Sequence, residues 1–154
     1  MKYIIGLFVT FLFSLFTLSQ KLPGEGWVLL NNGDTLFIQS GTYTGNIGGF
    51  ATGGVIIVSD LSTFQPTGMS HPNVHGTMYI YGTFIMNNNA QFRTNSDFTI
   101  HNYGMVQINY ETLTSGTNQL WTNYYGATMN FIGKVTMNGG AGDLNNSLNN
   151  YGTV

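Results

Sequence analysis

The chain has 154 residues, of which 6% are charged and 14% aromatic, and it contains no cysteine. Its net charge of −2 at pH 7 excludes a nucleic-acid-binding surface, which needs clustered lysine and arginine, and the absence of cysteine excludes disulfides. Asparagine, glycine and threonine fill the polar positions among many aromatic and β-branched residues. This composition favours strands joined by turns over long helices.

The first 19 residues have the pattern of a secretory signal peptide. A positive start is followed by an apolar run over residues 3–18, which is too short to span a bilayer comfortably. We predict cleavage near Ser19-Gln20, with an N-terminal membrane anchor as the alternative. The remainder has three basic and six acidic residues, is long enough for one domain, and is expected to contain no membrane span.

Residues 20–76 are predicted to form an N-terminal cap and the first, atypical coils of a solenoid. Segment 33–47 indicates a strand, a turn and a second short strand, and segment 53–60 indicates a buried strand. Residues 61–76 carry two of the three prolines and are expected to be a loop. A cap is expected here because the open end of a solenoid would otherwise expose its apolar core.

Residues 77–154 contain a Tyr-Gly pair four times, at intervals of 22, 22 and 26 residues. A period of this length in a turn-rich β sequence is typical of a solenoid. When the pairs are aligned, apolar residues alternate in the first repeats, which predicts short strands with one inward face. We therefore expect parallel coils of about 22 residues, stacked about 4.8 Å apart.

Each Tyr-Gly pair is predicted to form a corner at which like residues stack on like. Glycine would permit a positive φ at the corner, and neighbouring asparagines would hydrogen-bond from coil to coil. Repeated tyrosines would stack on one another. The residues assigned to these corners are Gly82, Gly104, Gly126, Gly152, Asn102, Asn123 and Asn150.

The third repeat departs from the alternating pattern. The alignment places Leu120 and Thr122 in the inward slots before the corner. After the corner it places Thr128 in an inward slot, whereas the apolar Met129 comes one position later. We expect a β-bulge near Tyr124-Tyr125 to shift the following strand by one residue, which exchanges its two faces.

Three sequence patterns resemble known protein groups. "GDTLFIQSGTY" (33–43) resembles the opening coil of right-handed parallel β-helix proteins of the pectate-lyase-like group. The "N-Y-G-x-V" coils look like those of bacterial β-helical surface adhesins. The leader ending "LFTLSQ" resembles leaders of bacterial proteins exported by the type IX secretion system. These resemblances imply a right-handed coil, export by that machinery and a C-terminal sorting domain. Because the sequence stops as a repeat opens, we expect it to be the N-terminal part of a longer protein.

Polysaccharide cleavage is the enzymatic activity that the resemblance implies, and it needs carboxylates close together. No two acidic residues are adjacent in the sequence, and Arg93, four residues before Asp97, is expected to form a surface pair with it. The segment "HPNVH" (71–75) holds two histidines, but Pro72 disfavours the helix that would bring them together as metal ligands. No catalytic residue, metal site or cofactor is therefore predicted.

Aromatic residues near the second and third coils are candidate glycan contacts, because sugar C–H faces stack on aromatic rings while hydroxyls meet amides. The alternative is that the tyrosines only support one another between coils. The candidates are Tyr110, Trp121, Tyr124 and Tyr125.

Together these features predict an all-β fold, a right-handed parallel β-helix with an N-terminal cap. The predicted function is a secreted or cell-surface, non-catalytic, adhesin-like segment, whose partners are carbohydrate or another surface protein. One alternative is the N-terminal part of a polysaccharide lyase or glycoside hydrolase with its acids further along the chain. A second alternative, a β-sandwich binding module, requires antiparallel pairing over residues 81–110.

Overall fold

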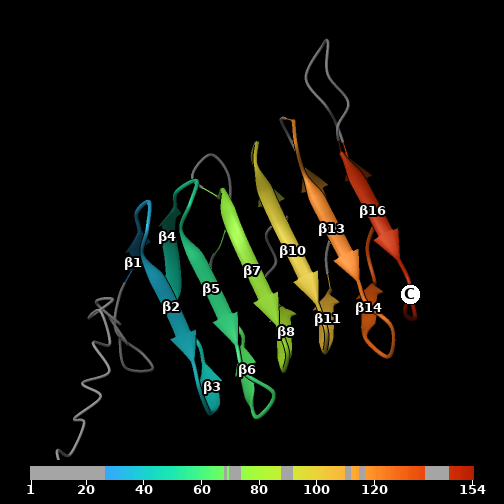
Figure 1. Cartoon of the computed structure of the whole chain (residues 1–154), viewed down its shortest axis with the longest axis horizontal. Helices are drawn as coiled ribbons and strands as arrows, with labels where there is room; N and C mark the ends of the chain where they lie inside the picture. The colour runs from blue at the N-terminus through green and yellow to red at the C-terminus, as the bar shows by residue number, and fades with distance from the viewer. Residues whose placement is uncertain are drawn as a thin grey trace, which may run out of the picture.

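The computed structural model describes residues 27–67, 69, 74–87, 92–109, 112–114, 117–137 and 146–154. The predicted signal peptide and cleavage site lie outside these residues, as does Tyr110. Within them every regular element is a strand, and every strand pair is parallel (Figure 1). The chain is a parallel β-solenoid, as predicted.

Each coil contributes one strand to each of two or three sheets that run along the solenoid. The six-stranded sheet contains β2 (Thr35–Ile38), β5 (Val55–Val58), β7 (Gly76–Ile80), β10 (Phe98–Asn102), β13 (Leu120–Asn123) and β16 (Ser147–Asn150). The five-stranded sheet contains β3 (Gly41–Tyr43), β6 (Ser62–Phe64), β8 (Thr83–Met86), β11 (Met105–Ile108) and β14 (Thr128–Phe131). A three-stranded sheet contains β9 (Phe92–Thr94), β12 (Thr112–Thr114) and β15 (Val135–Met137), and β1 (Trp27–Leu30) pairs with β4 (Asn46–Phe50).

The strand pairing confirms a coil of about 22 residues. Thr77 pairs with Thr99, 22 residues later, in the six-stranded sheet. Thr83 pairs with Met105, again 22 residues later, in the five-stranded sheet. Because the strands between residues 81 and 110 pair in parallel, the β-sandwich alternative is wrong. The right-handed sense of the coil stays a prediction.

The first coils are more regular than their sequence indicates. The predicted strands in 33–47 are β2 and β3, and segment 53–60 forms β5, in which only alternate residues are buried. Residues 61–76 are not simply a loop, because they include β6, which pairs with β3 and β8. Its apolar Phe64 gives this short strand an inward residue that outweighs the turn-rich sequence around it. The assignment of 20–76 as a cap stays a prediction.

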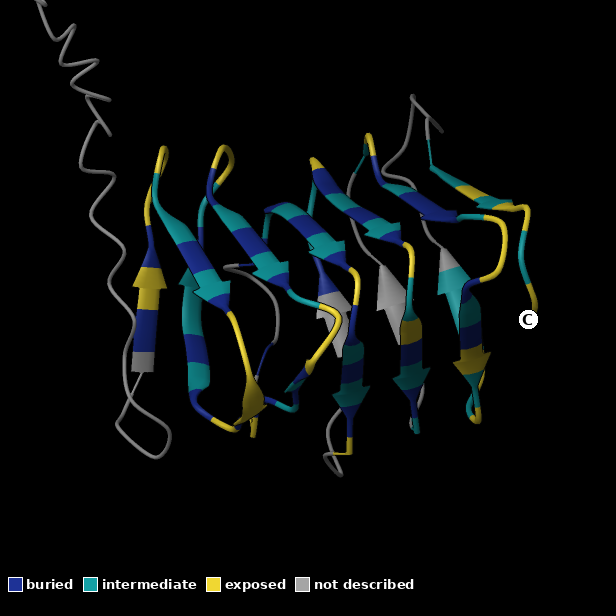
Figure 2. Ribbon diagram, turned by 60° about the horizontal axis from the view of Figure 1, so that its bottom comes forward, coloured by how far each residue is buried: buried dark blue, intermediate teal, exposed yellow. Residues whose placement is uncertain are grey.

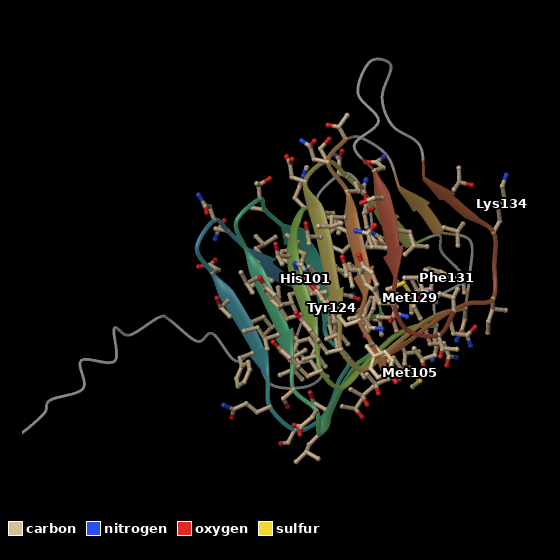
Figure 3. All side chains as sticks on the ribbon, turned by 45° about the vertical axis from the view of Figure 1, so that its right-hand side comes forward. His101, Met105, Tyr124, Met129, Phe131 and Lys134 are labelled. Carbon is tan, nitrogen blue, oxygen red and sulfur yellow. The ribbon has the colours of Figure 1, made fainter. Side chains whose placement is uncertain are left out.

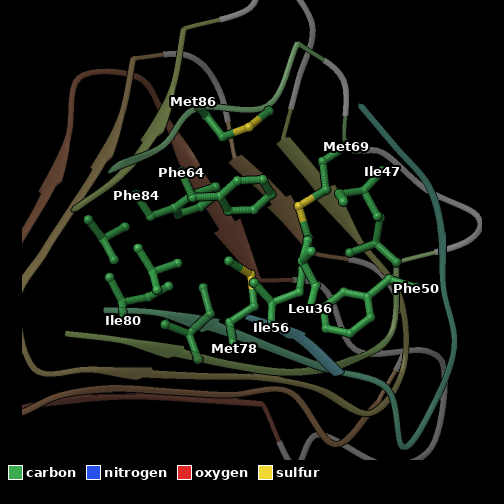
Figure 4. Packing of buried hydrophobic residues seen from close by; sticks show 14 of the residues in the cluster. Leu36, Ile47, Phe50, Ile56, Phe64, Met69, Met78, Ile80, Phe84 and Met86 are labelled. Atoms are coloured by element: carbon green, nitrogen blue, oxygen red, sulfur yellow. The ribbon is translucent and has the colours of Figure 1, made fainter. Parts of the chain in front are cut away.

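The core lies inside the coils and is built from alternate residues of each strand (Figure 2). In the first coils, Leu36, Ile56, Met78 and Ile80 line the six-stranded sheet, and Phe64, Phe84 and Met86 face them from the five-stranded sheet (Figure 4). Phe64 and Phe84 stack in successive coils with ring centroids 5.4 Å apart. Such aromatic pairs contribute about 0.5–1.5 kcal/mol beyond the burial of their area. The core is therefore a set of columns along the solenoid axis, in which each inward residue packs on the residue paired with it in the next coil.

The third coil differs from the alignment on both sides of its corner. Before the corner, Trp121 pairs with Ile100 and lies in the core, while Leu120 and Thr122 pair with the outward Thr99 and His101. The prediction that Leu120 and Thr122 point inward is wrong, because this strand joins the stack one residue early. After the corner, Met129 pairs with Val106 and is fully buried. Met129 thus faces inward, as predicted, but the predicted β-bulge near Tyr124-Tyr125 is wrong. The corner is two residues longer than the preceding one, so the inward faces of β13 and β14 stay in step, and the one-residue offset is already present at Trp121.

Candidate functional site

The corner between the six-stranded and five-stranded sheets brings the repeated asparagine, tyrosine and glycine together. Its inward column reads Val58, Ile80, Asn102, Asn123 and Asn150 from coil to coil. The residue that follows each member of this column points outward. One sequence motif therefore builds an inner polar ladder and an outer ring stack at the same corner.

The three asparagines form a ladder of amide hydrogen bonds, as predicted. The Asn102 Nδ2 donates to Asn123 Oδ1 at 2.7 Å, and the Asn123 Nδ2 donates to Asn150 Oδ1 at 2.8 Å. Asn102 and Asn123 are fully buried. Because a buried amide without partners costs about 1–3 kcal/mol, the ladder makes the burial of these side chains tolerable.

Two of the ladder amides also hydrogen-bond to the backbone of the next coil. Asn102 Nδ2 donates to the Thr128 carbonyl at 2.8 Å, and Asn123 Nδ2 donates to the Thr153 carbonyl at 2.9 Å. Within its own corner, Asn102 Oδ1 also accepts a hydrogen bond from the Gly104 N–H at 3.2 Å. Asparagine suits this position because its side chain supplies both a donor pair and an acceptor.

The corner glycines are needed for close approach rather than for a positive φ. A Cβ on Gly104 would lie 2.2 Å from the Gly82 carbonyl oxygen and 2.3 Å from that of Tyr81. Gly82 and Gly152 face similar backbone contacts from the coil beneath. The predicted reason for these glycines is wrong, since none of the three has a positive φ. Glycine is required at these three positions because the stacked corner leaves no room for a side chain.

Gly126 does not occupy the stacked corner to which the sequence alignment assigned it. Asn123 and Thr128 are separated by four residues, whereas Asn102 and Met105 are separated by two. Tyr125 and Gly126 are the extra pair. Gly126 has φ +83°, and a Cβ on it would meet no atom within 4 Å. The residue directly before β14 is the buried Ala127, and the longer corner leaves room for its Cβ. The even spacing of Tyr-Gly pairs is therefore misleading at this corner.

The outer column is a stack of tyrosine rings. Tyr81 and Tyr103 lie 5.0 Å apart between ring centroids, and Tyr103 and Tyr124 lie 4.2 Å apart, each pair with planes within 8°. Tyr124, rather than the predicted Tyr125, thus continues the stack. Figure 3 labels Tyr124 beside His101. A hydrogen bond with Tyr124, together with burial and the neighbouring phenols, raises the pKa of Tyr103 to about 12.

His101 joins the ring stack from the outward face of β10. Its ring lies 5.0 Å from that of Tyr79, nearly parallel to it, and its Nδ1 is 3.1 Å from the Tyr124 hydroxyl. Burial lowers the pKa of His101. A lowered pKa favours the neutral ring, whose Nδ1 can then accept the hydroxyl proton of Tyr124.

The candidate glycan contacts have separate environments. Trp121 is only 1% exposed and packs against Phe98 and Phe131 in the core, so its interpretation as an exposed contact is wrong. It lies inward because β13 joins the stack one residue early. Tyr125 is 94% exposed at the tip of the four-residue corner, and Tyr124 is half-buried in the ring stack.

The described acidic side chains have separate surroundings. Asp34 accepts hydrogen bonds from the backbone and side chain of Asn31, and Asp97 accepts one from Asn118 at 3.0 Å. Glu25, Glu111 and Asp143 lie outside the described residues, as do His71 and the side chain of Arg93. No group of three potential metal ligands occurs in the part of the chain that the structure describes. The Asp34 carboxylate therefore holds a turn, whereas the Asp97 carboxylate links two successive coils.

Asp60 belongs to a surface hollow that the sequence did not reveal. The hollow has a volume of about 310 Å³ and is lined by Phe37, Ile57, Ser59, Asp60 and Tyr81. Ser59 and Asp60 follow Val58 as Tyr81 and Gly82 follow Ile80, because Val58 pairs with Ile80. The signal available in the sequence was this replacement of Tyr-Gly by Ser-Asp, which only the pairing register makes visible.

A second hollow, of about 280 Å³, lies over the first coils beside Leu29, Phe50 and His75. The His75 Nδ1 donates to the Ser96 carbonyl at 2.6 Å, so this ring is held by the coil above. No helix that could cross a membrane occurs among the described residues.

Comparisons with known proteins do not assign the chain to a family, so its classification rests on its fold. No family model, no curated protein and no solved structure matches the chain. The likeness to pectate-lyase-like proteins, surface adhesins and type IX exported proteins therefore rests on the sequence patterns alone. What the structure establishes is a parallel β-solenoid with an asparagine ladder inside one corner and a tyrosine stack outside it.

Proposed function

We propose that the chain is a non-catalytic structural segment of a secreted or cell-surface, adhesin-like bacterial protein. It would hold a long and weakly charged surface away from the cell. The observation that carries the proposal is the continuous corner column, in which coils are tied by backbone ladders, by buried asparagines and by stacked tyrosines at once.

A mechanical load on the solenoid would be carried by the interfaces between neighbouring coils. In a solenoid each coil contacts only its neighbours, so stability accumulates along the axis one interface at a time. Between the last three coils, the ladder of Asn102, Asn123 and Asn150 adds directional hydrogen bonds to the non-directional apolar core. The first coils supply apolar Val58 and Ile80 at the same position. Both the first coils, with an apolar corner column, and the later coils, with an asparagine ladder, suit a spacer whose length is set by the number of coils.

Export would follow from the predicted signal peptide, and partners would be carbohydrate or another surface protein. The surface location is tested by labelling. Antibodies against the solenoid should bind intact cells of the organism that carries the gene, and brief protease treatment of those cells should remove the signal. Labelling only after lysis would overturn the surface location.

The structural role is tested separately by mechanical unfolding of the full chain between handles at residues 27 and 154. We expect resistance released in steps of about one coil, near 22 residues each. Replacement of Asn123 by Leu should lower the unfolding force, whereas replacement of the exposed Tyr125 by Ala should leave it unchanged. Equal forces in all three proteins would contradict the proposed load-bearing ladder.

A further inference from the structure

We propose that the hollow lined by Phe37, Ile57, Ser59, Asp60 and Tyr81 binds a neutral, gluco-configured glycan. This inference rests on the proposed surface location and adds a binding site to it. The site is distinct from the glycan contacts that the sequence predicted around Tyr125.

The hollow exists because the tyrosine stack ends at Tyr81. Tyr103 covers one face of the Tyr81 ring at a centroid distance of 5.0 Å. On the other side, the corner beneath carries Ser59 and Asp60 where a further Tyr-Gly pair would stand. Tyr81 is 47% exposed. One face of this ring therefore borders the hollow and is held flat from behind by the stack.

The floor of the hollow is apolar. Phe37 and Ile57 pair directly across β2 and β5 and are the outward residues of those strands. They lie half-buried beside Tyr81, and together the three side chains form a ledge of one aliphatic and two aromatic surfaces. Gluco-configured pyranosides carry their hydroxyls equatorially, so their C–H bonds form an apolar face that can lie on such a ledge.

The polar rim of the hollow accepts hydrogen bonds rather than donating them. The Ser59 hydroxyl already donates to the Gln39 carbonyl at 2.5 Å, so towards a ligand it acts as an acceptor. Asp60 is exposed and adds a carboxylate, which is acceptor-only when ionised. Sugar hydroxyls supply the matching donors. The same carboxylate disfavours acidic polysaccharides, because like charges repel.

The volume and openness of the hollow favour one or two sugar units of a longer chain. At about 310 Å³ it lies at the lower end of small-molecule sites, which span about 300–1,000 Å³. A quaternary or primary ammonium group is the competing ligand, since it also pairs with a carboxylate and an aromatic ring. Such ligands are held best in desolvated aromatic cages, whereas this hollow is open.

The experiment measures binding of cellohexaose and chitohexaose to the full chain by calorimetry, with an oligogalacturonate and tetramethylammonium as competing probes. We expect one or both neutral oligosaccharides to bind and the other two probes not to bind. Binding of tetramethylammonium alone, or of no neutral oligosaccharide, would overturn the glycan assignment. The surface-labelling and unfolding experiments above do not depend on this result.

Matched variants locate the site. Tyr81→Ala should weaken binding by about tenfold or more, which corresponds to about 1.4 kcal/mol, and Asp60→Asn should weaken it by a smaller factor. Tyr81→Phe keeps the stack and should retain most of the affinity, which separates ring stacking from misfolding. Tyr125→Ala, outside the hollow, should bind as the wild type does. Loss of binding in Tyr125→Ala but not in Tyr81→Ala would move the contact to the exposed corner and overturn the proposal.

Discussion

The second and third coils turn the same corner in two ways. From Asn102 the chain reaches Met105 through Tyr103 and Gly104 alone, and Gly104 presses against the carbonyl groups of the coil beneath. From Asn123 the chain needs four residues, Tyr124 to Ala127, before Thr128 rejoins the sheet. Both corners keep the asparagine ladder and the tyrosine stack. The ladder and the stack, rather than the Tyr-Gly pair in the sequence, therefore define the corner.

The largest expected effect comes from breaking the tight corner. Gly104→Ala should lower the free energy of unfolding by more than about 3 kcal/mol, because its Cβ would meet two backbone oxygens within 2.3 Å. Gly126→Ala in the longer corner meets no atom and should cost only about 1–2 kcal/mol, through its left-handed φ. Chemical denaturation of both variants measures the difference. Equal losses would contradict the stacked-corner explanation.

The second-largest effect is expected when the asparagine ladder, which both corners share, is broken. Asn123→Leu should lower the free energy of unfolding by about 2–3 kcal/mol, because Asn150 Oδ1 and the Thr153 carbonyl lose their donor in a partly buried site. Ile80→Val, one methylene smaller in the same column, is the control and should cost about 0.5–1.5 kcal/mol. If the control were the more damaging change, packing rather than the amide ladder would hold the column.

A smaller effect is expected when the longer corner is converted into the shorter one. Deletion of Tyr125 and Gly126 combined with Ala127→Gly gives the third coil the arrangement of the second. We expect a change within about 1 kcal/mol, since surface loop length has a small entropic cost. The same deletion with Ala127 retained should be clearly more destabilising, because a Cβ then occupies the tight position. Thermal unfolding of the two deletion variants, compared with the wild type, tests whether the corners are interchangeable.

The smallest effect concerns the outer stack that links the corners. Tyr124→Phe keeps the ring but removes the hydroxyl, so the pKa of Tyr103 should fall from about 12 towards its ordinary value of 10. Because the folded pKa is raised, the associated stability is present below pH 10 and is lost as the pH rises towards 12. Ultraviolet titration of the phenols at these pH values follows the change. Tyr125→Phe is the control and should leave the titration of Tyr103 as it is.

Much of the fold could be predicted because residues that stack in successive coils recur at a nearly fixed interval in the sequence. The 22-residue interval and the alternation in the strands around Tyr103 predicted parallel coils, and the pairing shows them. The asparagines Asn102, Asn123 and Asn150 predicted an amide ladder, which is also present. Each depends on neighbours one coil away, which is a relation that a repeat preserves. Where the repeat is exact, the tertiary structure is a periodic copy of a local pattern.

The candidate site was harder to predict because register errors exchange the faces of a strand. A single-residue offset in β13 moved Trp121 from the predicted surface to the core, and the extra pair Tyr125-Gly126 concealed Tyr124 as the stacked ring. The hollow beside Asp60 was invisible for a related reason. Its side chains come from different coils, and the first coils lack the Tyr-Gly signal that would have aligned them.

The sequence by itself determined that this protein is all-β, coiled with a period of about 22 residues and held by asparagine and tyrosine at its corners. These properties follow from residue chemistry and spacing, which do not change with the path of the backbone. Only the tertiary structure decided which side chains face inward, why the corner glycines are required and where a ligand could lie. Those properties depend on the strand register and on contacts of 2–5 Å between coils, which one inserted residue is enough to alter.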